Sequence, residues 1–291
     1  MRLASFIHDG KPRIGVVLKD GMLDLAQVTP KLPPTMKQFL AAGDQAMDIA
    51  RKAADMDGPR IPFGEFRLRP PISQPGKILA IGLNYKDHVE EGGRELPKHQ
   101  IWFNKQHNAI NGPAGNIVAP AVSDLLDYEG ELCFVIGKRC RHVPKARAHE
   151  VIAGYMVGND VSVRDWQKRS PTMQMGKSFD THAPTGPWIV TPDEIGDPQN
   201  LGLKTWVNDE LRQDANTSQM LFDIGDQIEH LTQAFTLDPG DIIFTGTPAG
   251  VGFAMDPPGY VKPGDVVRIE IEKVGSIQNK VIEEIVQTVI G

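Results

Sequence analysis

This sequence has no long apolar run, only two cysteines and no excess of basic charge. No apolar run approaches the roughly 18 residues needed to span a bilayer, so we predict no membrane-spanning helix. The chain has 31 Lys and Arg against 37 Asp and Glu, a formal net charge of −6. A nucleic-acid partner or an anionic membrane surface would favour a basic face instead. The sequence therefore predicts neither partner.

The two cysteines, Cys133 and Cys140, form neither a CxxC pair nor a disulfide framework. Residues 1–10 contain one arginine and a very short apolar stretch, which predicts no signal peptide. A reducing compartment fits this pattern best, and we therefore predict a cytoplasmic protein.

The length and the punctuation of the chain predict two domains. At 291 residues it is long enough for a large domain and a small one. Residues 61–76 are rich in proline and glycine and are typical of a linker. We place a small N-terminal domain at residues 1–70 and a larger domain at residues 71–291.

The N-terminal part combines strand and helix patterns. Residues 3–8 and 13–18 are candidate strands joined as a hairpin across Asp9-Gly10. Apolar residues at helical spacing predict a helix over residues 35–54, with Thr35 as its N-cap. This pattern indicates a small α+β unit.

The larger part is rich in strands. Only two or three helices are expected, one of them after Asn84 and another over about residues 218–234. We expect strands at residues 77–81, 131–136, 151–163, 188–190, 203–207, 241–245 and 266–271. Because strands and helices do not alternate, a doubly wound parallel sheet is disfavoured. A mainly β fold with some α, built as a sandwich or a closed β-roll, fits better.

Two glutamates stand at the mouth of an apolar run within residues 127–137 (DYEGELCFVIG). A strand points alternate side chains to one face, so Glu129 and Glu131 would lie close together. Two anions at one place repel unless a cation lies between them, and hard oxygen ligands suit Mg²⁺, Mn²⁺ or Ca²⁺. A third carboxylate, Asp160, ends another apolar run. The alternative is an exposed strand face with two solvated acids.

A histidine and a glutamate lie three residues apart within residues 84–91. On a helix, His88 and Glu91 would share a face. A carboxylate beside an imidazole fixes its tautomer and raises its basicity, which makes a general base near neutral pH. The alternative is an exposed helix whose charged face is solvated.

Residues 175–181 contain a GKS sequence that is not a phosphate-binding loop. Such a loop needs glycine five residues before Gly176, where this chain has Pro171. Lys177 is a candidate for a buried cation near the metal site. A surface lysine in a loop is the alternative.

Two further segments are candidates for contacts to an anionic substrate. Three glycines within residues 245–252 allow backbone N–H groups, including that of Gly246, to approach an anion closely; a plain turn is the alternative. Arg164 is a candidate carboxylate clamp on the same cavity as Asp160, and a structural Arg–Asp pair is the alternative.

The chain resembles the fumarylacetoacetate hydrolase family over about residues 76–280, because it contains five sequence motifs of that family in the same order. The motifs are GLNYKDH at 82–88, DYEGEL at 127–132, GYMVGNDVSVRD at 154–165, GKSFDT at 176–181 and TGTPAGVG at 245–252. The resemblance implies a mixed β-roll, a small N-terminal domain and a homodimer. It also implies a small-molecule 2-oxo acid substrate and Mg²⁺ or Mn²⁺ as cofactor.

The same resemblance implies roles for individual residues. Glu129, Glu131 and Asp160 match the three carboxylate metal ligands of the family, and Lys177 matches its active-site lysine.

His88 and Glu91 match the family's His–Glu dyad, on a segment that orders over substrate. Thr247 matches a threonine that contacts the substrate carboxylate. The chain departs from the family at residues 103–108 (FNKQHN), where members often have Lys-Pro, so substrate contacts there stay open.

The leading hypothesis is hydrolytic C–C cleavage of a 2,4-dioxo acid, either an acylpyruvate or a sugar-derived 2,4-dioxo-3-deoxy acid. His88, held by Glu91, would take a proton from the attacking water, and Lys177 would stabilise the negative charge that develops. The alternatives are decarboxylation of an oxaloacetate-like acid and isomerisation or hydration of a 2-hydroxy-dienoate. A non-catalytic, metal-stabilised scaffold is a further alternative that gives no reason for the His88–Glu91 pair.

Overall fold

The structure is a computed structural model that describes residues 1–29 and 31–290. Its first three strands form a meander: β1 (Arg2–His8), β2 (Lys11–Leu18) and β3 (Gly21–Asp24). Asp9 and Gly10 both have positive φ, 50° and 70°, which is the geometry of the tight hairpin turn that matches strand twist. The predicted hairpin is confirmed.

The segment predicted as one helix over residues 35–54 is two helices, α2 (Met36–Ala41) and α3 (Asp44–Ala54), preceded by a short α1 (Leu25–Val28). Gly43 breaks the run with a φ of 71°, a left-handed conformation that glycine adopts without steric cost. Thr35 caps α2, because its side chain accepts a hydrogen bond from the backbone N–H of Gln38.

The proline-rich segment 61–76, expected to be a linker, packs against the first strands of the chain. Its short strand β4 (Arg67–Leu68) pairs with β1, and Ile61 and Ile72 are buried. Strand β1 also pairs with β13 (Ala183–Val190), so the N-terminal strands extend the sheet of the larger part.

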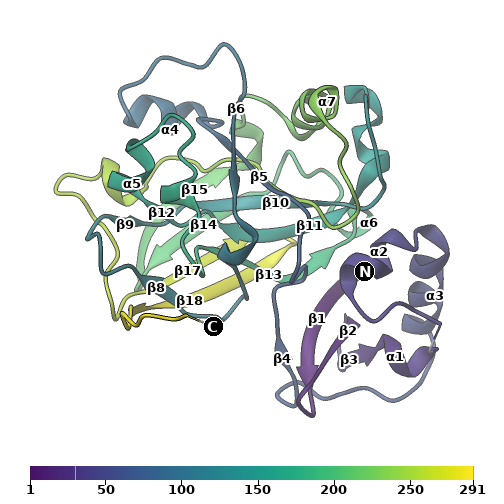
Figure 1. Ribbon diagram of the computed structural model, residues 1–291. Coiled ribbons are helices and arrows are strands. Elements are labelled where there is room, and N and C mark those ends of the chain that lie inside the picture. The colour runs from purple at the N-terminus through teal and green to yellow at the C-terminus, as the bar shows by residue number, and fades with distance from the viewer. Residues whose placement is uncertain (30, 291) are drawn as a thin grey trace.

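The rest of the chain is mainly strand, as predicted (Figure 1). The remaining strands are β5 (Ile78–Gly82), β6 (Ile101–Lys105), β7 (Ile110–Asn111), β8 (Ile117–Ala119), β9 (Leu126–Asp127), β10 (Gly130–Ile136), β11 (Ile152–Asn159), β12 (Ser162–Val163), β14 (Gly202–Val207), β15 (Glu210–Asn216), β16 (Ile242–Phe244), β17 (Val266–Ile271) and β18 (Gly275–Glu283). The helices are α4 (Lys86–Glu91), α5 (Arg164–Lys168), α6 (Pro192–Ile195) and α7 (Ile224–Ala234).

The larger sheet has eleven strands: nine follow the path β3-β2-β1-β13-β11-β10-β16-β5-β6, while β4 pairs with β1 and β7 pairs with β13 off this path. It packs on a five-stranded sheet ordered β15-β14-β17-β18-β8. Strand β10 is buried at every position, and its successive side chains point to opposite faces of the sheet. Its Leu132 and Phe134 share a core with Leu203 of the smaller sheet, whereas Cys133 and Val135 lie in the core on the other face. The predicted mixed, mainly β fold is confirmed.

Two predicted elements are shorter than expected. The strand predicted over residues 151–163 ends at Asn159, and Ser162–Val163 belong to a separate two-stranded ribbon with β9. The helix predicted from residue 218 begins at Ile224, because Asp223 caps it in a capping box with Asp226. Within residues 1–29 and 31–290, no helix has the length and apolar character to cross a bilayer.

Candidate active site

Three carboxylates meet where β10 begins and β11 ends. These strands are antiparallel, with Gly130 opposite Asn159, so the residues just outside them also become neighbours. The backbone N–H of Asp160 donates to the carbonyl of Glu129 at 2.9 Å. Glu129, Glu131 and Asp160 are all buried, and each offers a carboxylate oxygen within 4.8 Å of the others.

Glu131 shows why this cluster suits a cation. Its carboxylate accepts a hydrogen bond from the Gly246 N–H at 2.7 Å, and it has no ion-pair partner in the part of the chain that the structure describes. Burial, together with repulsion from Asp160 and Glu129, raises its pKa well above the usual value. A divalent cation bound by oxygen ligands would relieve both effects, so the donor set fits Mg²⁺ or Mn²⁺.

Two buried lysines neutralise part of this charge. The Nζ of Lys177 lies 2.7 Å from both Glu129 Oε2 and Asp160 Oδ2, and the Nζ of Lys105 lies 2.5 Å from Asp160 Oδ1. Burial alone would lower the pKa of Lys177, but Asp160 and Glu129 raise it, whereas burial lowers the pKa of Lys105. Lys177 is therefore a buried cation beside the candidate metal ligands and not a surface lysine.

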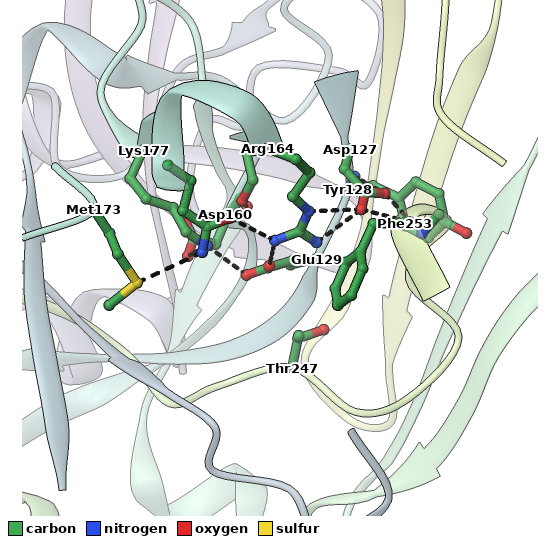
Figure 2. A network of polar contacts seen from close by, with 12 residues as sticks. Asp127, Tyr128, Glu129, Asp160, Arg164, Met173, Lys177, Thr247 and Phe253 are labelled. Atoms are coloured by element: carbon green, nitrogen blue, oxygen red, sulfur yellow. Dashed lines mark hydrogen bonds and ion pairs between the residues drawn. The ribbon is translucent and has the colours of Figure 1, made fainter. Parts of the chain in front are cut away.

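Arg164 lies between two carboxylates instead of facing open solvent (Figure 2). Its guanidinium donates to Asp127 Oδ2 at 2.8 Å and to Glu129 Oε1 at 2.5 Å, and the ring of Phe253 packs 4.6 Å from its Cζ. Burial alone would lower the pKa of Arg164, but the negative charges of Asp127 and Glu129 outweigh burial and raise the pKa above its usual value. Arg164 thus forms the structural Arg–Asp pair with Asp127, and it also lines the cavity described below.

The backbone N–H groups of the glycine-rich loop do approach anions, and those anions belong to the protein itself. Gly246 donates to Glu131, Gly250 donates to Glu91 at 2.9 Å, and Gly252 donates to Asp127 at 2.8 Å. This loop therefore fixes the positions of three carboxylates around the site.

Thr247 is held within the same loop and lines the cavity. Its hydroxyl donates to the carbonyl of Gly130 at 3.0 Å and accepts from Gln213 Nε2 at 2.8 Å. Gln213 also accepts from the Gly130 N–H at 3.0 Å, so it joins β15 to the start of β10.

His88 and Glu91 lie on α4, as the spacing predicts. His88 Nδ1 is 2.8 Å from Glu91 Oε1, and because a carboxylate only accepts, Nδ1 carries the proton. The other ring nitrogen, Nε2, has no hydrogen-bond partner among residues 1–29 and 31–290. Phe253 packs edge-on against the imidazole with ring centroids 6.3 Å apart.

Several of these groups line one cavity of about 490 Å³. His88 lies in its wall together with Glu129, Glu131 and Lys177. The arrangement places an imidazole, with one ring nitrogen free among the described residues, beside buried carboxylates, which is suited to moving a proton next to a bound cation.

The sequence patterns assigned no role to three residues of this network, Lys105, Asp127 and Gln213. A lysine at the end of an apolar strand, as in Ile101–Lys105, was the available signal for the first. Gln213 lies in the exposed-looking hairpin strand β15, and no local pattern marks it.

Comparison with known proteins places the chain in one family. The family model described as fumarylacetoacetate (FAA) hydrolase C-terminal matches residues 77–282. The mitochondrial oxaloacetate tautomerase Fahd2a of Rattus norvegicus is 42% identical over 287 residues, covering 97% of this chain and 92% of the relative. A fumarylacetoacetate hydrolase domain-containing protein 2 homolog of Dictyostelium discoideum is 43% identical over 288 residues, covering 94% of each chain.

Solved structures agree. A maleylpyruvate hydrolase from Sphingobium sp. SYK-6, in complex with manganese(II) and pyruvate, matches with a TM-score of 0.82 and 36% identity over 97% of this chain and 99% of its own. A 5-carboxymethyl-2-hydroxymuconate delta-isomerase from Mycobacterium smegmatis matches with a TM-score of 0.78 and 36% identity over 98% and 100%. The chain belongs to the fumarylacetoacetate hydrolase family.

Proposed function

We propose that this protein is a metal-dependent tautomerase that interconverts the enol and keto forms of a 2-oxo dicarboxylic acid of the oxaloacetate type. The observation that carries the proposal is that His88, paired with Glu91, lines the same cavity as two members of a carboxylate cluster that suits a divalent cation. The substrate class follows the relatives that share 42–43% identity and are named oxaloacetate tautomerases.

Glu129, Glu131 and Asp160 would hold Mg²⁺ or Mn²⁺, which supplies Lewis-acid stabilisation of negative charge on the 2-oxo oxygen. In the keto-to-enol direction, His88 Nε2 would remove a proton from the carbon next to the 2-oxo group, and solvent would protonate the enolate oxygen. In the reverse direction the oxygen would lose its proton to solvent, and protonated His88 would return a proton to the carbon. Glu91 keeps Nδ1 protonated and stabilises the imidazolium that forms. Lys177 would add a second positive charge near the oxygen on which charge develops.

Hydrolytic C–C cleavage of a 2,4-dioxo acid is the second candidate. It uses the same residues, but His88 Nε2 would take its proton from a water that attacks the distal carbonyl. The similarity to a maleylpyruvate hydrolase supports it. The two reactions differ in whether carbon or water gives up the proton.

The test follows ketonisation of enol-oxaloacetate by its loss of ultraviolet absorbance, with purified protein and Mg²⁺ or Mn²⁺. We expect acceleration that disappears with a chelator and is restored by added metal. Glu131→Gln should lose metal activation, whereas Glu283→Gln, an exposed glutamate on β18, should behave as wild type. Release of pyruvate and an acid from acylpyruvates, without acceleration of ketonisation, would establish the second candidate instead.

A further inference from the structure

Two unpaired cations stand at the mouth of the cavity, and neither has a role in the chemistry above. We propose that Arg94 and Lys168 form a binding site for a second carboxylate, the one at the far end of a dicarboxylate substrate. This inference rests on the proposed function, because it assumes that the 2-oxo acid end binds at the buried carboxylate cluster. It makes the protein selective for dianionic over monoanionic 2-oxo acids.

A helix C-terminal motif at the end of α4 sets the backbone position of Arg94, which lines the cavity. Gly93 has a φ of 64°. The backbone N–H of Gly93 donates to the carbonyl of Glu90 at 3.0 Å, and the backbone N–H of Arg94 donates to the carbonyl of Val89 at 3.1 Å. This is the Schellman pattern, which fixes the backbone of the residue after the glycine. The Gly92-Gly93 pair thus places Arg94 directly after the helix that carries His88, and the Arg94 side chain lines the cavity.

Lys168 reaches the same mouth from a different element. It is the last residue of α5 and lies four residues after Arg164, so the two side chains share a face of the helix. Both lie over Phe253, with Arg164 Cζ 4.6 Å and Lys168 Nζ 5.9 Å from the ring centroid. Arg164 is buried and paired, whereas Lys168 is exposed on the cavity rim.

Neither cation has a counter-ion within residues 1–29 and 31–290. Among the residues that the structure describes, the side chains of Arg94 and Lys168 form no ion pair or hydrogen bond. Glu95, next to Arg94 in the chain, is exposed and forms no ion pair with it among the described residues, and two other nearby acids are already engaged. Glu91 binds His88 and the Gly250 N–H, and Asp165 binds Ser123 and Arg169.

The charge of the cavity wall also favours a dianion. Its cationic side chains are Arg94, Arg164, Lys168 and Lys177, and its carboxylates are Glu129 and Glu131. The carboxylates are buried and the two unpaired cations are exposed, so the positive charge increases toward the opening. A molecule with a carboxylate at each end can satisfy both regions, and its attraction to the rim is electrostatic.

The experiment compares oxaloacetate with oxaloacetate 4-methyl ester, which keeps the reacting end and lacks the second charge. The variants are Arg94→Gln, Lys168→Gln and the double variant. Matched controls are Lys98→Gln in the loop after α4 and Arg169→Gln next to Lys168, both exposed and outside the cavity wall. Each single variant should lower kcat/KM for oxaloacetate about tenfold, the order expected for a charge-assisted hydrogen bond, and mainly through KM.

For the ester, kcat/KM should change less than about twofold, because no charge is lost from the contact. An equal loss on both substrates, or no loss on oxaloacetate, would overturn the inference. If wild-type protein turns over neither compound, the proposed function fails. The subsite is then tested separately by calorimetry, which measures the affinities for malate and for malate 4-methyl ester in the presence of Mg²⁺. A preference for malate that vanishes in the double variant supports the subsite, and equal affinities contradict it.

Discussion

At the scale of single residues, His88 is the side chain whose loss should separate chemistry from metal binding. It lies on the cavity with Nε2 open, but it makes no hydrogen bond to Glu129, Glu131 or Asp160. A positioned base contributes about 10²–10⁴-fold to rate, so His88→Ala should lower kcat by that order. Its Mg²⁺ or Mn²⁺ affinity, measured by calorimetry, should equal that of wild type.

A histidine outside the cavity supplies the control. His230 is exposed near the end of α7, so His230→Ala should keep wild-type kcat. If His88→Ala retains wild-type rates on the substrate of the protein, the base is another group. If it loses metal, His88 supports the carboxylate cluster instead of acting on substrate.

The sequence patterns indicated most residues of this site, because strands and helices repeat their side-chain directions at fixed spacings. Glu129 and Glu131 face one way because strands alternate, and His88 meets Glu91 because helices repeat every three to four residues. Lys105 could not be given a partner in this way. Its contact with Asp160 spans 55 positions in sequence, and it depends on which strands become neighbours in the sheet.

At the scale of elements, the pairing of β10 with β11 holds the carboxylates, and Gly158 permits that pairing. Gly158 lies opposite Glu131, and a Cβ there would come within 2.4 Å of Cys133 Sγ and 2.6 Å of a Phe244 ring carbon. Overpacking of this kind costs about 1–3 kcal/mol. Gly158→Ala should therefore lower stability to urea by that amount and weaken Mg²⁺ binding.

The matched control is Gly202→Ala on β14, where a Cβ would meet only Glu272 Oε2 at 3.8 Å. That variant should unfold within about 0.5 kcal/mol of wild type. Wild-type stability and Mg²⁺ affinity in Gly158→Ala would show that β10 and β11 can separate slightly without disturbing the carboxylates.

Element boundaries were predicted less well than element types, because local conformation decides them. A glycine with φ of 71° divides the helix expected over residues 35–54, although the apolar spacing continues through it. The capping box at Asp223 delays α7 by six residues relative to the prediction. Apolar periodicity reports which face is buried and says little about where the backbone turns.

At the scale of the whole molecule, the sequence divided the chain near residue 70, and the structure joins the two parts in one sheet. Leu3 of β1 pairs with Ile189 of β13, and the N-terminal ammonium donates to Thr191 Oγ1 at 2.7 Å. One apolar core contains residues of both parts, among them Leu3, Ile14, Val135 and Ile189. No local pattern reveals a strand pairing between positions nearly 190 residues apart.

This shared core predicts that residues 1–70 and the larger part unfold together. Leu3→Ala deletes a fully buried side chain and should cost about 2–5 kcal/mol. If unfolding is cooperative, hydrogen exchange in β10 should accelerate as much as in β2. The exposed Leu211 on β15 is the control, and Leu211→Ala should leave both rates near wild type. Faster exchange confined to β2 would mean that the N-terminal strands open separately, and that the β1–β13 pairing does not couple them to the carboxylate site.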